Sequence, residues 1–148
     1  MAQSALHFNF EIASPERVVL RAVVTQVSVP TAQGEITVLA HHIPLVANLK
    51  SGVVEAVLSD GSREVMSVSG GLVEIMVGKV VILADTAERA AELDEARISA
   101  AKAQAEALKA QARQHDDVEF ARLSALIEKE LARERSLKRW KRIDSLHS

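Results

Sequence analysis

Cysteine is absent from this chain of 148 residues, and three phenylalanines and one tryptophan are its only aromatic residues. The missing thiols exclude disulfides, thiol nucleophiles and most structural zinc sites, and they fit a reducing compartment. No apolar run reaches the roughly 20 residues of a membrane helix, and residues 1–10 lack the pattern of a signal peptide. We therefore expect a soluble protein without direct membrane insertion.

An excess of one charge is also missing, because the formal net charge is only −2. A chain this close to neutral has no long-range field that attracts nucleic acid. Glycine and proline are missing from the second half, since all six glycines and all three prolines lie at or before Gly78. Alanine dominates beyond that point. The composition therefore predicts a β module over residues 1–85 and a helical arm over residues 86–148.

The first half has the two-residue period of half-buried strands. Apolar and polar side chains alternate over residues 6–12, which places Phe8, Phe10 and Ile12 on one face. Further β-rich runs follow at residues 18–29, 35–39, 53–58, 63–68, 72–77 and 80–84. Turn signals such as Asp60-Gly61 separate them, and no helical pattern intervenes. The pattern predicts an antiparallel sandwich or barrel.

The second half has the period of amphipathic helices. Steps of three and four predict one apolar stripe of a first helix, formed by Leu93, Ala96, Ala100, Ala103, Ala107 and Ala110. The stripe of a second helix is formed by Phe120, Leu123, Ile127 and Leu131. We expect starts at Asp85 with Glu88 and at Asp116 with Glu119, the latter after a polar break that includes Gln114 and His115. The alanine stripe buries little area, so the resulting hairpin should dock weakly as a conformational arm.

Motifs for catalysis or metal binding are missing. His41 and His42 are adjacent, so in an extended segment they point to opposite faces, which does not suit a metal site. Ser69-Gly70-Gly71 lacks the downstream Lys-Ser/Thr of a phosphate loop, and no Gly-x-Ser-x-Gly occurs. The sequence therefore predicts a protein that is not an enzyme.

Motifs in both halves resemble one known family. They are Gly-Gly-Leu-Val-Glu at residues 70–74, Val-Ile-Leu-Ala-Asp-Thr-Ala-Glu-Arg at residues 81–89 and Leu-Asp-Glu-Ala-Arg at residues 93–97. Upstream, Val-Ser-Val-Pro at residues 27–30 precedes Gly34-Glu35 and His-Ile-Pro-Leu at residues 42–45. In this order and spacing, the motifs resemble the ε subunit of bacterial and organellar F-type ATP synthase over nearly the whole chain.

The resemblance implies an α+β fold, in which an N-terminal antiparallel β-sandwich is followed by a C-terminal antiparallel helical hairpin. It implies a non-catalytic rotor subunit of the central stalk that binds the γ subunit and the c-ring. Such a subunit couples proton or sodium ion flow to ATP synthesis, and its hairpin restrains ATP hydrolysis at the α/β catalytic head. The expected place is the cytoplasmic face of the bacterial plasma membrane, peripherally, in preference to an organelle. The alternative is a stand-alone sandwich adaptor that senses nucleotide or binds a helical partner.

The resemblance also implies loops that face the c-ring, formed here by Gln33, Gly34, Glu35, His41 and His42. His41 and Thr37 stand where the family often has glycine. Because other residues disfavour positive φ, we expect this end of the sandwich to have a different loop shape.

Some family members hold ATP as a regulatory ligand, without any other cofactor, through an Ile/Leu-Asp-x-x-Arg-Ala motif. Leu93, Asp94 and Arg97 match it, whereas Ile98 takes the final place. Arg133 could supply a phosphate contact, while Lys129 stands where a further arginine is expected and lacks its bidentate fork. The alternative is that Asp94 caps the first helix and Arg97 forms surface ion pairs.

The final residues, 133–148, contain six basic side chains against two acidic ones. The basic side chains are Arg133, Arg135, Lys138, Arg139, Lys141 and Arg142. One reading is a solvated helix end that complements the macrodipole. The family resemblance favours contact with an acidic surface of the catalytic head. A third reading, nucleic acid stacked on Trp140, has little support from a near-neutral chain.

Overall fold

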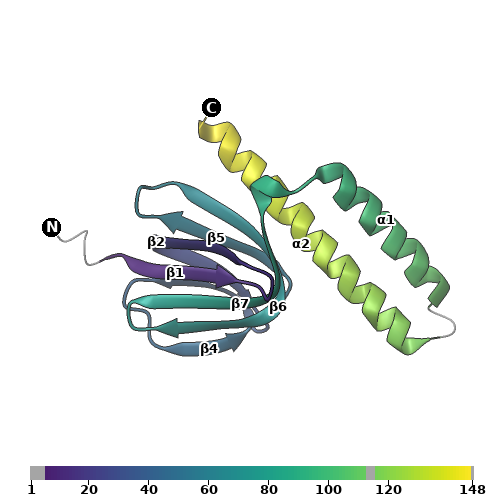
Figure 1. Ribbon diagram of the computed structural model, residues 1–148, viewed down its shortest axis with the longest axis horizontal. Coiled ribbons are helices and arrows are strands. Elements are labelled where there is room, and N and C mark those ends of the chain that lie inside the picture. Colours follow the sequence, from purple (N-terminus) through teal and green to yellow (C-terminus); the bar gives the residue numbers. More distant parts are fainter. Residues whose placement is uncertain (1–5, 113–115, 148) are drawn as a thin grey trace.

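The computed structural model describes residues 6–112 and 116–147, which form a β-sandwich and two long helices (Figure 1). The seven strands are β1 (Phe8–Ala13), β2 (Val18–Thr31), β3 (Gly34–Leu39), β4 (Leu45–Asn48), β5 (Gly52–Leu58), β6 (Arg63–Met76) and β7 (Lys79–Arg89). A 3₁₀ turn, η2 (Ala90–Glu92), leads to the helices α1 (Glu95–Ala112) and α2 (Asp117–His147). The predicted α+β architecture is confirmed.

The strands pair in the order β1-β7-β6-β5-β2-β3, with β4 on β6 and an additional pairing of β1 with β2. Every pairing is antiparallel except that of β1 with β7, which is parallel. The first strand of the chain therefore lies between the second strand and the last one, and the sheet curls around a single core. The alternation of apolar and polar residues had predicted antiparallel pairing throughout. It shows which side chains face inward but not which strands pair, so it could not predict the parallel pairing of β1 with β7.

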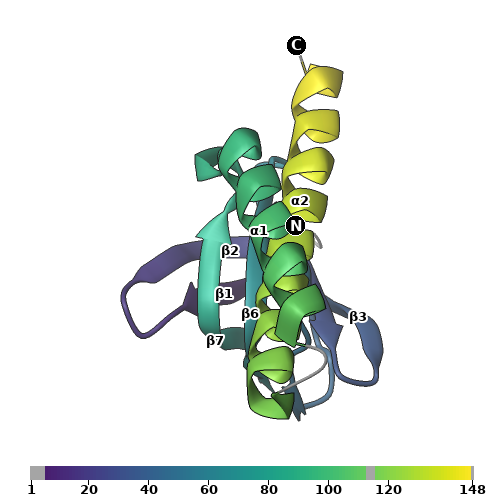
Figure 2. The same cartoon turned by 90° about the vertical axis from the view of Figure 1, so that its right-hand side faces the viewer.

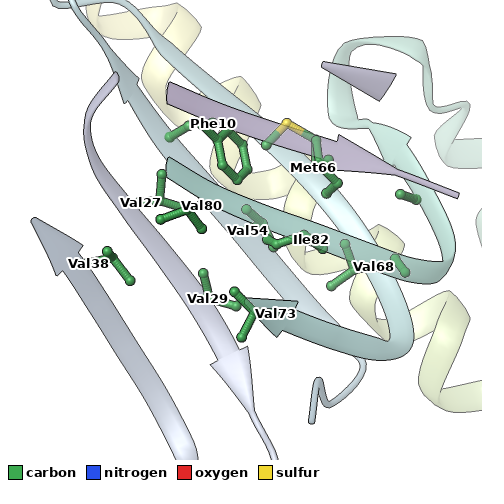
Figure 3. Close-up of a cluster of buried hydrophobic side chains, with 14 of the residues drawn as sticks. Phe10, Val27, Val29, Val38, Val54, Met66, Val68, Val73, Val80 and Ile82 are labelled. Atoms are coloured by element: carbon green, nitrogen blue, oxygen red, sulfur yellow. The ribbon is translucent and has the colours of Figure 1, made fainter. Parts of the chain in front are cut away.

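Valine and isoleucine side chains fill the space between the layers, together with Phe10 and Met66 (Figure 3). The predicted alternation is confirmed in β1, where Phe8, Phe10 and Ile12 are all buried. Because pleated strands present every second side chain to one face, this apolar row faces inward without interruption. The sandwich thus has a complete core that does not depend on the helices.

Two strands are longer than the sequence pattern indicated. The expected runs 63–68 and 72–77 belong to one strand, β6, which bends at Gly70 and Gly71 with φ of 64° and 106°. A side chain at Gly71 would overlap the backbone oxygen of Leu83, so only glycine fits there. Strand β7 continues to Arg89, so the expected module boundary between residues 85 and 86 falls inside a strand.

Both helices begin at an aspartate. Asp94 Oδ1 accepts a hydrogen bond from Arg97 N at 3.2 Å, and Asp116 Oδ1 accepts from Val118 N at 3.0 Å and Glu119 N at 3.1 Å. The predicted start at Asp116 is confirmed, whereas the start at Asp85 is wrong because Asp85 pairs within the sheet. The expected polar break includes Gln114 and His115, which lie outside the described residues.

Helix α2 lies across β5 and β6, and α1 lies on the outer side of α2 (Figures 1 and 2). The predicted apolar stripe of α2 is partly confirmed, since Leu123 is buried and Phe120, Ile127 and Leu131 are half-buried. The predicted stripe of α1 is wrong. Its alanines at 96, 100, 103, 107 and 110 are exposed, and the buried side chains are Ile98 and Ala105.

Eight of the 18 residues of α1 are alanine and they occur on opposite sides of the helix, which explains this error, because the spacing of alanine alone then selects no face. The single isoleucine buries more apolar area than any alanine and sets the rotation of the helix. Within the described residues, neither helix has the length and hydropathy that a membrane span requires.

Candidate functional site

The contact between α2 and the sandwich includes charged side chains beside the buried Val65 and Ser67 of β6. Arg133 of α2 forms two hydrogen bonds to Glu88 of β7, from Nε at 2.6 Å and from Nη2 at 2.7 Å. Its third nitrogen, Nη1, donates to Glu130 Oε1 at 2.6 Å. Burial favours the neutral guanidine, but these two carboxylates outweigh it and raise the pKa of Arg133. This fork is a defined latch between the arm and the sheet.

A second ion pair lies farther along α2. Arg139 Nη1 donates to Glu55 Oε2 of β5 at 2.9 Å, and the other oxygen of Glu55 accepts from Arg63 at 2.7 Å. Together with the Arg133 latch, it holds α2 at two points about 1.7 helical turns apart. The Arg139 side chain is 42% exposed, and an ion pair this exposed to water stabilises a contact by about 1 kcal/mol or less, so Arg139 contributes less to docking than Arg133 does.

The two helices are also joined by charged pairs. Glu134 of α2 accepts hydrogen bonds from Lys102 of α1 and from Lys138, both at 3.1 Å. These two lysines lower the pKa of Glu134, Lys138 having the larger effect. Near the start of α1, Glu95 pairs with Lys141 at 2.5 Å. Because these pairs lie within the hairpin, they hold it together whether or not it contacts the sandwich.

The residues predicted to bind ATP share one pocket. Asp94, Arg97 and Arg133 line a cavity of about 300 Å³ between η2, the start of α1 and α2. Four carboxylates line it as well, those of Glu88, Glu92, Asp94 and Glu130. Arg133 is held by two of these, so a phosphate group would have to replace Glu88. ATP binding here stays a prediction, and Asp94 meanwhile has the capping role that the alternative reading gave it.

Among the described residues, Glu130 Oε2 is buried without a hydrogen-bond partner. Its other oxygen is paired with Arg133. A buried carboxylate with one unsatisfied oxygen depends strongly on its remaining cationic partner. Arg133 therefore supports the local packing of α2 as well as its contact with the sheet, a role that the sequence pattern does not show.

The loops predicted to face the c-ring lie at two ends of one strand. Gln33, Gly34 and Glu35 form the β2–β3 turn, whereas His41 and His42 follow the end of β3. A strand of this length spans about 20 Å, so the two groups occupy different parts of the surface. Their role at the c-ring stays a prediction.

The backbone at His41 has a φ of 67°, in the left-handed region that favours glycine. A histidine at position 41 therefore does not prevent a positive φ there, contrary to what its residue type predicts. His42 stabilises the turn through a hydrogen bond between Nδ1 and the Ile43 oxygen at 2.7 Å. Thr37 lies in the extended strand β3, with its hydroxyl oxygen 3.3 Å from that of Ser28.

The six basic side chains predicted to contact the catalytic head are mostly engaged within the chain. Arg133 and Arg139 are paired with the sandwich, and Lys138 and Lys141 with residues of the hairpin. Among the described residues, no ion pair is formed by Arg135 or Arg142. In this arrangement, contact of the whole set with another protein requires that α2 leave the sandwich.

Sequence reasoning missed an apolar surface on the outside of the sheet. Leu72 and Leu83 are direct cross-strand neighbours and are 36% and 51% exposed, and Val46 on the adjoining β4 is 65% exposed. Val81 and Ala13 continue this surface, which we call the outer sheet face. The signal was present in the unbroken apolar run of residues 80–84, because strands covered on both sides do not alternate.

A β-sandwich with an apolar outer face and an ion-paired helical hairpin defines the chain as a two-part subunit of a larger assembly. Residues 7–90 match the family model of the β-sandwich domain of the ATP synthase delta/epsilon chain. The chain therefore belongs to the ATP synthase ε-chain family, and it is a non-catalytic subunit of that complex.

Curated relatives agree with this assignment, and a solved structure shares the fold. The ATP synthase epsilon chain of Dichelobacter nodosus is 48% identical over 101 residues, which are 68% of this chain and 71% of the relative. That of Chloroflexus aggregans is 43% identical over 97 residues, 66% and 69% of the two chains. A chain in the mitochondrial ATP synthase structure of Euglena gracilis, with OSCP, F1 and c-ring, has the same fold, with a TM-score of 0.77, 22% identity and coverage of 88% and 81%.

Proposed function

We propose that the chain is a rotor subunit of the central stalk, which couples ion flow through the c-ring to ATP synthesis and restrains ATP hydrolysis through its hairpin. The observation that carries this proposal is the structural separation of the sandwich from the helical hairpin. The sandwich has its own core and an apolar outer face, whereas the arm is a separate layer on β5 and β6 that ion pairs help to hold in place.

The outer sheet face is the proposed binding surface for the γ subunit. Apolar side chains that remain exposed on adjacent strands mark surfaces that another protein covers. Val46, Leu72 and Leu83 lie away from the helices, so γ can bind whether the arm is docked or released. The β2–β3 turn and the His41–His42 turn are the proposed contacts with the c-ring.

The hairpin is the proposed brake on ATP hydrolysis. Release of α2 would free Arg133 and Arg139 from their sandwich partners and present a row of cations to the α/β catalytic head. An acidic surface there would compete with Glu88 and Glu55 for the same side chains. The balance between docked and extended arms is set by a few kcal/mol, so small changes in the latch shift it strongly.

ATP is a proposed regulatory ligand of this switch. The shared pocket of Asp94, Arg97 and Arg133 supports it, because Glu88 of β7 completes the lining of this pocket only when the arm is docked. The proposed location of the assembly is the cytoplasmic face of a bacterial plasma membrane, where the chain would be peripheral.

The test is ATP hydrolysis by the reconstituted catalytic head with γ. It compares no added chain, the full chain, and a chain ending at Glu92, which keeps all of β7 and η2. We expect both chains to copurify with γ and only the full chain to inhibit. If both bind and neither inhibits, the brake is refuted and coupling remains. Failure of both to bind γ would refute the rotor assignment and favour a stand-alone adaptor.

A further inference from the structure

A cleft of about 470 Å³ lies between the last third of α2 and the edge of the sandwich. Its sandwich side consists of the end of β2, the β2–β3 turn and the residues that lead into β5. It shares no residue with the pocket around Asp94. The volume falls within the range of about 300–1,000 Å³ that small-molecule sites occupy.

The cleft is strongly positive. Five cationic side chains line it against the single carboxylate of Glu35; they are Lys50, Arg135, Lys138, Arg139 and Arg142. Lys138 and Arg139 are paired with acids outside the lining, but over residues 6–112 and 116–147 no acid is paired with Lys50, Arg135 or Arg142. Cations gathered in a concave site attract anions more strongly than the same charges on a flat surface.

The sandwich side of the cleft is fixed by backbone contacts. Lys50 N donates to the Pro30 oxygen at 3.0 Å, and Thr31 forms a bridge with Leu49. Gly52 lies so close to Pro30 that an added Cβ would be 3.0 Å from the proline Cβ. The cleft wall is therefore preformed, and ligand binding would not have to order it.

We propose that this cleft binds a compact polyanion of the oligophosphate type. Arg135 and Arg142, which have no carboxylate partner among the described residues, offer planar forks for phosphate oxygens, and Lys50 offers a point charge from the opposite wall. Because Lys50 belongs to the sandwich and Arg135 and Arg142 to the arm, the anion binds across both parts. It therefore favours the docked arm over the extended one. This effect on hydrolysis rests on the proposed function, whereas the binding itself does not.

The experiment titrates the full chain with sodium tripolyphosphate at constant ionic strength and follows binding by calorimetry. The fluorescence of Trp140, the single tryptophan, gives a second signal, because Trp140 is next to Arg139 of the cleft. The test variant is Lys50→Gln with Arg142→Gln. Both side chains are exposed and lack ion pairs in the described structure, so the fold should be retained, which circular dichroism checks. The matched control is Lys79→Gln with Arg21→Gln, which removes equal charge from exposed positions outside the cleft and outside the pocket around Asp94.

We expect one tripolyphosphate per chain, with affinity at least tenfold weaker in the test variant and unchanged in the control. An ATP titration with the same dependence would mean that the phosphate groups are recognised. The proposal is overturned if tripolyphosphate does not bind, if both double variants weaken binding equally, or if only the control weakens it. Binding of a hexaglutamate peptide without tripolyphosphate binding would also overturn it, in favour of an acidic protein segment.

Discussion

Replacement of Arg133 by glutamine should release the hairpin from the sandwich. The side chain is 21% exposed and donates three hydrogen bonds, two to Glu88 and one to Glu130. Hydrogen bonds to charged groups contribute about 1.5–3 kcal/mol, and partial exposure reduces that value. The change also leaves Glu130, only 6% exposed, without its cationic partner. We expect docking to weaken by about 2–3 kcal/mol, or 30- to 150-fold in the ratio of docked to released arms.

The assay is hydrogen exchange at residues 90–98, which join the sandwich to α1 and which we call the hinge. In the docked arm, Leu93 N donates to the Ala90 oxygen at 3.1 Å and Ile98 N donates to the Asp94 oxygen at 3.0 Å. Release should speed exchange there while the sandwich amides stay protected. Acrylamide quenching of Trp140, half-buried when docked, gives a second reading. Arg122→Gln is the control, because within the part of the chain that the structure describes Arg122 pairs only with Glu119, one turn away on the same helix.

Unchanged hinge exchange in the Arg133 variant would refute the latch, since the charged contact would then contribute nothing to docking. Equal acceleration in the Arg122 control would also refute it, because helix charge in general would then be responsible. Loss of protection throughout the sandwich would contradict the independence of its core.

Three further expectations concern the fold and the hairpin. Gly71→Ala should destabilise the sandwich by more than about 2 kcal/mol, because the backbone there has positive φ and leaves no room for a methyl group. Thermal unfolding checks this against Gly61→Ala, where φ is also positive but the space is open. Ala105→Leu should separate the helices at a cost of about 1–3 kcal/mol while Ala103→Leu is tolerated, as measured by helical circular dichroism on heating. Lys138 and Lys102 lower the pKa of Glu134 below its usual 4.5. The ion pairs of Glu134 therefore stabilise the hairpin above that pH, and this stabilisation is lost as the pH falls through the lowered pKa. Glu134→Gln should reduce the loss of helicity in an acid titration followed by circular dichroism.

The class of fold could be read from the sequence because strand and helix periods occupy separate halves. Phe8, Phe10 and Ile12 alternate with polar residues, and their burial follows directly. Asp116 precedes a clear helical stripe, so its capping role was readable as well. In each case, a local pattern determines the structure without help from distant residues.

The errors occurred where a distant contact decides the outcome. Asp85 resembles a helix cap, but pairing of β7 with β6 keeps it in a strand. Spacing cannot choose a face of α1, because Ile98 makes that choice through its contact with α2. The latch was missed for the same reason, since Glu88 and Arg133 are 45 positions apart and each resembles an ordinary surface charge.

The parallel pairing of β1 with β7 determines when this protein can fold. The sandwich closes only after β7 has left the ribosome, because until then β1 lacks one of its two neighbours. Such distant pairing makes folding slow and leaves strand edges uncovered in the nascent chain. The α-helical arm is synthesised last, so its docking surface on β5 and β6 is complete before α2 exists. Order of synthesis thus separates the slow closure of the sandwich from the fast formation of the helical hairpin.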